Sequence, residues 1–313
     1  MRRARADLVF RAGTGALASL LVVIVCAIAV VLAIDSWTSI QTFGWIFWRT
    51  QVWDPVAHTF GALPFIWGTL YSSFLGLAIA TPIALGIAVF VAELSPPWLE
   101  QPLVFLTELL ASIPSIVYGL WGIFVLVPVV RGLAAALPDS LRELPFFAGP
   151  PLGLGLLTAA VVLAIMVIPF TSSVAREVLK SVPVAQREAA YALGATRFEA
   201  IRAAMFSARS GIIAGIMLGL GRALGETMAV AMVIGNNPKV SLSLFAPQYS
   251  MAAVIANEFA EASDELYVSA LVEIGLILFV ITLVVNSLSR LMIAAMSQPA
   301  QPIASSEPEA ARA

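Results

Sequence analysis

The stretch GIIAGIMLGLGRALGETMAVAMVI, residues 211–234, places Arg222 and Glu226 inside an otherwise apolar run. An arginine at the centre of a membrane helix costs about 2.5–3.5 kcal/mol on insertion scales, so it is retained where it faces protein, a water-filled cavity or a partner. On one continuous helix, residues four apart emerge about 40° apart, which predicts both side chains on one face. Two interpretations stay open: a charged part of a transport path, or an intrahelical ion pair packed against a neighbouring helix.

The composition indicates an integral membrane protein. The chain has 313 residues, of which 60% are hydrophobic and 12% charged, whereas soluble domains carry about 25% charged residues. The net charge of −2 excludes the strongly basic surface of a nucleic-acid-binding protein. With the single cysteine Cys26 and the single histidine His58, the sequence predicts no internal disulfide and no metal site.

Six segments are long and apolar enough to cross a bilayer, which takes about 20 residues of helix. They are residues 16–34, 65–92, 103–127, 152–170, 211–234 and 267–288. The first exceeds the roughly 7–15 apolar residues of a signal-peptide core, so we interpret it as a retained anchor. The sequence therefore predicts an all-α membrane protein with six transmembrane helices.

Basic residues predict the orientation. With six spans, both termini and the loop 171–210 share one side, and that side holds twelve of the seventeen lysines and arginines, against four on the other. Because cytoplasmic flanks carry the excess of positive charge, the N-terminal tail 1–15, the loop 171–210 and the tail 293–313 are predicted to be cytoplasmic.

The predicted outer segments differ in composition. Residues 35–64 carry several tryptophans and phenylalanines, which is typical of a segment lying at the lipid headgroups. Residues 235–266 are acidic and could dock a partner. The end of the C-terminal tail, residues 302–313, is rich in Pro, Ala, Ser and Glu and is predicted to be disordered.

Small residues and prolines in the spans predict close helix packing and bends. These small residues are Gly211, Gly215 and Gly219 in one series and Gly221 and Gly225 in a second, and the prolines are Pro82, Pro114 and Pro169. Such packing would hold Arg222 and Glu226 in a protein interface. We expect the membrane carboxylates Glu108 and Glu273 to make ordinary helix contacts.

The cytoplasmic loop contains a second candidate site. Residues 184–204 predict two short amphipathic helices interrupted at Gly194, with an apolar surface too small to form a core. Such a surface indicates docking to a partner, or else a self-packed loop that covers the mouth of the membrane domain.

Within that loop, Glu188-Ala189-Ala190 and Gly194 resemble the EAA loop of ABC importer permeases. The resemblance implies the type I ABC importer permease (MetI-like) fold. It also implies that the helix bearing Glu188, Ala189 and Ala190 couples to a cytoplasmic ATPase.

Three further stretches resemble the PstC family of phosphate importer permeases: SIPSIVYGLWG at 112–122, RALGETMAV at 222–230 and NEFAEA at 257–262. The similarity covers a permease core at 65–292. It implies a subunit of a high-affinity phosphate importer in the bacterial inner membrane. The implied partners are a PstA-like permease, two copies of a PstB-like ATPase and a PstS-like periplasmic phosphate-binding protein.

The chain has no Walker A motif, because the Lys180-Ser181 pair lacks the glycines that must precede it. We therefore expect a non-catalytic subunit without a bound cofactor, with ATP and Mg²⁺ used by the partner ATPase. Arg222 offers a planar donor fork for a phosphate oxygen pair. Glu226 could accept a hydrogen bond from a P–OH group, which sulfate lacks, and Thr227 could lend its hydroxyl.

Alternative functions remain open at this level. An ABC permease for another oxyanion, such as molybdate or sulfate, would use the same charged residues. An ion-coupled secondary anion transporter would need no ATPase. A membrane enzyme is not favoured, because the sequence offers no plausible nucleophile, base and metal cluster together.

Overall fold

The computed structural model describes residues 2–296, which form helices and no strand longer than an isolated bridge. The long helices are α1 (Arg2–Asp35), α3 (Leu63–Val89), α4 (Pro97–Ser112), α8 (Leu156–Ser181), α11 (Arg209–Leu224) and α14 (Glu265–Met296). The short elements before α8 are α2 (Trp37–Phe43), η1 (Gly44–Ile46), η2 (Phe90–Leu94), α5 (Ser115–Trp121), η3 (Gly122–Leu126), α6 (Val127–Ala136) and α7 (Asp139–Arg142). Those after α8 are α9 (Val184–Ala192), α10 (Arg197–Ser207), α12 (Met228–Val233) and α13 (Met251–Glu258). The predicted all-helical fold is confirmed.

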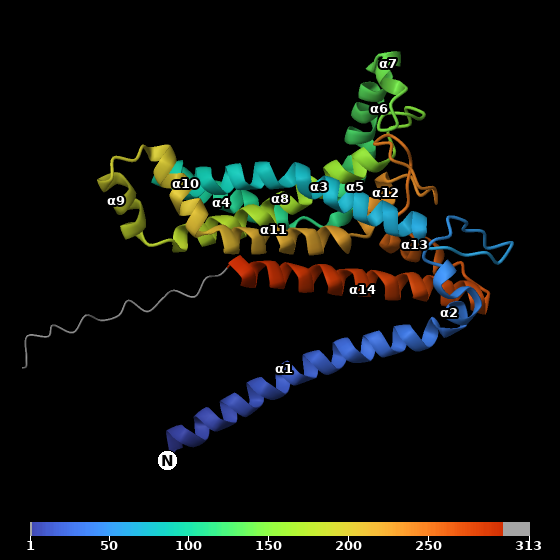
Figure 1. Cartoon of the computed structure of the whole chain (residues 1–313), viewed down its shortest axis with the longest axis horizontal. Helices are drawn as coiled ribbons and strands as arrows, with labels where there is room; N and C mark the ends of the chain where they lie inside the picture. Colours follow the sequence, from blue (N-terminus) through green and yellow to red (C-terminus); the bar gives the residue numbers. More distant parts are fainter. Residues whose placement is uncertain (1, 297–313) are drawn as a thin grey trace, which may run out of the picture.

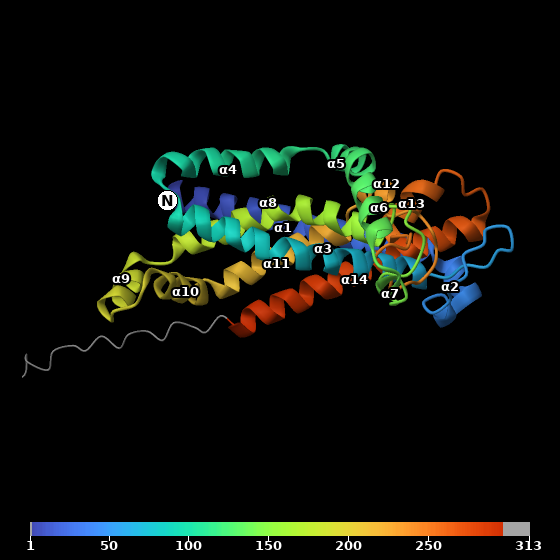
Figure 2. The same ribbon diagram turned by 90° about the horizontal axis from the view of Figure 1, so that it is seen from above.

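The long helices run roughly side by side, with α9 and α10 at one end of the bundle and α2, α12 and α13 at the other (Figures 1 and 2). Helix α8 lies at the centre and packs against α3, α4 and α11. Of its most apolar window 61% is buried, against none of the corresponding window of α1. Helix α1 leans away and meets the bundle along α14 (Figure 1).

Glycines bring α11 into close contact with α8. A Cβ atom on Gly211 would lie 2.5 Å from Val178 Cγ1, and one on Gly219 would lie 2.7 Å from Thr171 Oγ1. The close packing predicted for the first glycine series is therefore confirmed. It does not extend to Gly225, which lies beyond the end of α11 and has only backbone of its own turn nearby.

Five helical segments meet the length and hydropathy of a membrane span on their own: Phe10–Asp35, Leu63–Leu94, Ser115–Ala136, Leu156–Ser181 and Glu265–Met296. A sixth is reached if α10 and α11, which meet at a 68° bend, count as one broken span. This number is consistent with the six predicted spans, although two of them, 103–127 and 211–234, are not continuous helices.

The predicted continuous span 103–127 is broken by a proline. Helix α4 ends at Ser112 and α5 begins at Ser115, with Ile113 and Pro114 extended between them. The hydroxyl of Tyr118 donates to the carbonyl of Leu110 at 2.8 Å and bridges the break. Beyond α5 and η3, helix α6 turns away from the long axis of the bundle (Figure 1). A proline cannot donate its backbone hydrogen bond, and here the chain leaves the helix.

Three other predicted boundaries move because helices continue past the apolar residues. Helix α8 extends to Ser181, so the predicted loop 171–210 begins with more than two turns of helix. Residues 2–15 of the predicted tail belong to α1, and α14 continues to Met296. The rest of the predicted C-terminal tail, residues 297–313, lies outside the described part of the chain.

The aromatic segment 35–64 folds over the bundle instead of lying wholly at the headgroups. Phe47 and Phe60 are buried in a cluster with residues of α3, α13 and α14. Both the indole nitrogen of Trp53 and the hydroxyl of Tyr267 donate to Glu258 Oε2, at 2.8 and 2.6 Å. Trp37 and Trp45 stay exposed, and their role as headgroup anchors stays a prediction.

The two membrane carboxylates have different surroundings. Glu273 is buried, and its Oε2 accepts a hydrogen bond from Ser39 Oγ at 2.5 Å, which ties α2 to α14. The helix contact expected of Glu273 is confirmed. Glu108, in contrast, is exposed on α4 in the isolated chain.

Candidate functional site

Arg222 and Glu226 do not share a helix, so the predicted single face is wrong. Helix α11 ends at Leu224, and α12 begins at Met228. Gly225, a poor residue for a helix interior, forms the C-cap of α11. The structure therefore places Arg222 in the last turn before a break and Glu226 and Thr227 within the break, at partly buried positions.

Arg222 stacks on an aromatic ring of the central helix. Its guanidinium carbon lies 4.3 Å from the ring centroid of Phe170 on α8. Within residues 2–296 the guanidinium donates no hydrogen bond, and no ion pair joins it to Glu226; its Nε is buried and unpaired. Contact with a ring face uses none of the N–H donors, so the guanidinium keeps its hydrogen-bonding capacity for an acceptor that enters the site.

The carboxylate of Glu226 supports the start of α12. Its Oε1 accepts the backbone N–H of Ala229 at 3.3 Å. The first amides of a helix have no partner within the helix, and an acidic side chain just before them can supply one. The hydroxyl of Thr227 donates to the carbonyl of Gly225 at 3.3 Å. These local bonds explain why the helix stops here and restarts.

The second candidate site is the α9–α10 hairpin, defined as residues 184–207. Gly194 adopts φ +83° and follows α9, and the amides of Gly194 and Ala195 donate to the carbonyls of Tyr191 and Ala190. These paired bonds form a Schellman motif, which glycine favours because a left-handed residue is required. The predicted interruption at Gly194 is confirmed.

A capping box begins α10. The Thr196 side chain accepts from the Glu199 amide, and the Glu199 carboxylate accepts from the Thr196 amide at 2.8 Å. The hydrogen bonds from the backbone and side chain of Thr196 hold the pKa of Glu199 below its usual value. The turn between the two helices is therefore fixed by local hydrogen bonds at both ends.

The hairpin presents apolar side chains to solvent at the end of the bundle. Leu193 is 90% exposed and Phe198 73% exposed. Glu188 and Ala189 are exposed on α9, whereas Ala190 is partly buried. The other side of the hairpin packs on the bundle, since Ala204 of α10 is buried in a cluster with Ala88 and Leu179. Docking to a partner and covering the mouth of the membrane domain both stay predictions.

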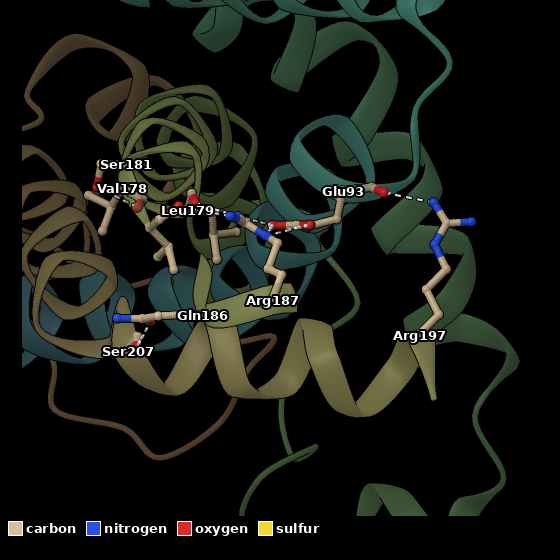
Figure 3. Close-up of polar contacts among 9 residues, drawn as sticks. Glu93, Val178, Leu179, Ser181, Gln186, Arg187, Arg197 and Ser207 are labelled. Carbon is tan, nitrogen blue, oxygen red and sulfur yellow. Dashed lines mark hydrogen bonds and ion pairs between the residues drawn. The ribbon is translucent and has the colours of Figure 1, made fainter. Parts of the chain in front are cut away.

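Sequence interpretation missed two residues at these sites. Phe170, the partner of Arg222, follows Pro169 in an apolar span and carries no local signal of its role. Glu93, in η2, binds Arg187 of α9 with its carboxylate and Arg197 of α10 with its backbone carbonyl (Figure 3). A charge pattern could have identified Glu93. The loop 93–102 contains glutamates and no basic residue, and the loop 171–210, predicted on the same side of the membrane, is strongly basic.

Residues 80–298 match the model of a family described as the binding-protein-dependent transport system inner membrane component. This match spans more than half of the chain. The chain belongs to this permease family.

Curated relatives place it within the PstC group of that family. A protein named phosphate transport system permease protein PstC from Haemophilus influenzae is 49% identical over 295 residues, covering 92% of this chain and 93% of the relative. Its counterpart from Mesorhizobium japonicum is 46% identical over 298 residues, covering 93% and 91%. A probable PstC from Methanocaldococcus jannaschii is 39% identical, covering 79% of this chain and 81% of the relative.

The fold is similar to a solved permease structure. The chain aligns with one chain of the inward-facing MetNI methionine ABC transporter with a TM-score of 0.59 and 16% identity, covering 79% of this chain and 100% of that chain. At this identity the similarity concerns the fold alone, and it confirms the predicted MetI-like architecture.

Proposed function

We propose that this chain is a transmembrane permease subunit of an ATP-driven phosphate importer. The curated relatives that carry the name of a phosphate transport permease match it over nearly its whole length, which supports phosphate as the substrate class. The observation that carries the proposal is the Arg222 guanidinium, held on Phe170 at a helix break with its donors unused.

Arg222 is proposed to bind phosphate oxygens during translocation. Buried charge within a membrane segment is costly and marks a substrate or ion pathway more often than a structural contact. Broken membrane helices are where transporters commonly place such sites, because the interrupted backbone must line a cavity or a protein interface. A guanidinium fork fits two oxygens of one phosphate.

Glu226 is proposed to favour an anion that still carries a proton. Phosphate near neutral pH keeps a P–OH group, which can donate to the carboxylate, whereas sulfate has no such donor and is repelled. The hydroxyl of Thr227, in the same break, offers a further polar contact. In this role Glu226 acts on selectivity, and Arg222 supplies the attraction.

The α9–α10 hairpin is proposed to dock on a cytoplasmic ATPase. Its exposed apolar residues, among them Leu193 and Phe198, need a partner to cover them. Glu188, Ala189, Ala190 and Gly194 are the proposed coupling residues. Without a phosphate-binding loop of its own, the chain relies on ATP and Mg²⁺ bound by that partner and holds no cofactor itself.

The proposed assembly contains a PstA-like permease as the other half of the path, two copies of a PstB-like ATPase and a PstS-like periplasmic binding protein. The proposed location is the bacterial inner membrane with both termini in the cytoplasm. In support, the start of α1, the end of α14 and the α9–α10 hairpin lie at the same end of the bundle (Figures 1 and 2).

Reconstitution in liposomes tests the proposal. The chain is incorporated with its candidate partners, and uptake of phosphate, sulfate and molybdate is compared with and without ATP inside. ATP-dependent uptake that prefers phosphate is the expected result. Uptake driven by an ion gradient without ATP would favour a secondary transporter, and a preference for molybdate or sulfate would assign a different oxyanion.

A further inference from the structure

Glu93 connects three segments at the hairpin end of the bundle. It lies in η2, which continues α3. Its carboxylate accepts hydrogen bonds from Arg187 on α9, with Nη2 at 2.5 Å from Oε1 and Nε at 3.2 Å from both oxygens (Figure 3). Its backbone carbonyl accepts from Arg197 Nη2 at 2.8 Å, at the start of α10.

Arg187 also binds the end of α8. Its Nη1 donates to the carbonyl of Val182 at 2.8 Å, and its Nη2 donates to the carbonyl of Leu179 at 2.9 Å. The last carbonyls of a helix lack the partners that its interior has, so these contacts add donors at the end of α8, where the Leu179 carbonyl also accepts from the Val182 amide. One guanidinium therefore ties α9 to both α3 and α8.

Polar contacts hold helix α9: besides the Arg187 bonds, Gln186 Oε1 accepts from Ser207 Oγ of α10 at 2.7 Å (Figure 3). None of its nine residues is buried, so apolar packing does not fix it to the bundle. Helix α10 differs, because Ala200 and Ala204 are buried. The Glu93 and Arg187 side chains are themselves only 11% and 19% exposed, so water screens their attraction weakly. A fork of parallel hydrogen bonds also fixes orientation, which a single point contact does not.

We propose that Glu93 is a positioning residue that transmits the movement of α9 to the membrane helices. This inference rests on the proposed function, in which α9 follows an ATPase. A displacement of α9 acts through Arg187 on α3 and on the end of α8. Both helices pack against α11, which carries Arg222. The contact thus gives the substrate site a mechanical connection to the docking surface.

The experiment compares Glu93→Gln with a matched control in the liposome-reconstituted complex. Glu100→Gln removes another carboxylate at the same end, which pairs with Lys180 of α8 and does not contact α9. Two quantities are measured: the ATPase retained per complex, and the phosphate transported per ATP hydrolysed. The second reports coupling, which a purely structural role would not change in an assembled complex.

For Glu93→Gln we expect unchanged ATPase retention, continued ATP hydrolysis and about a tenfold fall in phosphate transported per ATP, the scale of one lost charge-assisted hydrogen bond. Glu100→Gln should match the wild type. Arg187→Lys, which keeps the charge but cannot reach the carboxylate and two carbonyls together, should also uncouple. In the double variant the loss should not exceed that of the more damaging single variant, because both changes remove one interaction.

A wild-type ratio in Glu93→Gln would overturn the inference, and so would an equal loss in Glu100→Gln. Failure of both Glu93→Gln and Arg187→Lys to retain the ATPase would make the pair an assembly contact and would overturn it as well. These outcomes are distinct from failure of the proposed function, which would appear as absence of ATP-dependent phosphate uptake in the wild-type complex.

Discussion

The guanidinium carbon of Arg222 lies 4.3 Å from the ring centroid of Phe170, which joins the last turn of α11 to the middle of α8. A cation over an aromatic face gains about 0.5–2 kcal/mol, depending on how far it is desolvated. This attraction orients the guanidinium without using any of its N–H groups. A salt bridge would instead neutralise the charge and occupy its donors.

Replacing Arg222 should abolish transport without loss of assembly. In Arg222→Ala, phosphate uptake should fall at least about a hundredfold, and Arg222→Lys should retain more of it but still lose about tenfold, because an ammonium lacks the planar fork. Arg209→Lys is the matched control, since Arg209 lies on the same helix and stacks on Phe206 at 4.0 Å. Uptake of ³²P-phosphate measures the effect, and wild-type rates in Arg222→Ala would remove this residue from the path.

Glu226→Gln should weaken the selectivity for phosphate over sulfate and leave the fold of the helix break intact. Glutamine retains an oxygen that can accept the Ala229 amide, so the start of α12 should survive. Loss of the negative charge should weaken discrimination of phosphate against sulfate by about tenfold. Competition by sulfate during phosphate uptake measures this ratio, and an unchanged ratio would refute the role proposed for the carboxylate.

Leu193→Asp should detach the ATPase while leaving the permease folded. The side chain is 90% exposed, so the folded chain loses almost no buried contact, whereas a docked partner would have to desolvate a carboxylate. Val56→Asp, at an 89% exposed position on the opposite end of the bundle, is the matched control. Copurification of the ATPase measures docking, and equal retention in both variants would contradict the assigned surface.

Gly194→Ala should impair ATP-dependent transport because it strains the backbone, not because the new side chain clashes. No atom lies within 4 Å of the added Cβ, but φ is +83°, a region that costs an alanine about 1–2 kcal/mol. Gly194→Asn should be milder, because asparagine tolerates left-handed conformations. Gly86→Ala, on helix α3 with nothing near its Cβ, should be neutral. ATP-dependent uptake in the reconstituted complex separates these variants, and a neutral Gly194→Ala would show that the α9–α10 turn can reshape freely.

Gly219→Val should lower the thermal stability of the isolated chain. Its Cβ would meet Val167 Cγ1 and Thr171 Oγ1 at 2.7 Å, and overpacking of this kind costs about 1–3 kcal/mol. Gly221→Ala, whose Cβ would meet Asn286 at 3.6 Å, should unfold at the wild-type temperature. Thermal unfolding in detergent provides the comparison, and equal midpoints would argue against close α11–α8 packing.

Hydropathy was sufficient to predict the helical membrane fold, but not where helices break. Pro82 and Pro169 lie inside continuous helices, whereas the chain leaves the helix at Pro114. Proline weakens a helix by the same local mechanism in all three places, so the surrounding packing decides the outcome. Similarly, α8 continues through residues 171–181 because Ala175 and Leu179 are buried, although that stretch also holds charges.

The sequence was sufficient to identify most of the candidate residues, but not their arrangement in space. Arg222 and Glu226 stand out as charges in an apolar run, yet the break between them, where the Ala229 amide of α12 donates to the Glu226 carboxylate, could not be predicted from that pattern. Gly194 was recognisable as a helix end because glycine is typical of that position. Glu93 lies about ninety residues from Arg187, so their pairing becomes visible only when the fold brings them together.

The interruption between α11 and α12 limits which molecules can contact the bundle around residues 225–227. The last carbonyls of α11 and the first amides of α12 lack helical partners, and hydrocarbon chains offer none. Bonds within the break satisfy some of these groups, among them the Ala229 amide and the carbonyls of Ala223 and Gly225. Any group that they leave without a partner needs water or a second polypeptide beside residues 225–227 in the working complex. A boundary lipid in contact with the rest of the bundle should be excluded from this patch.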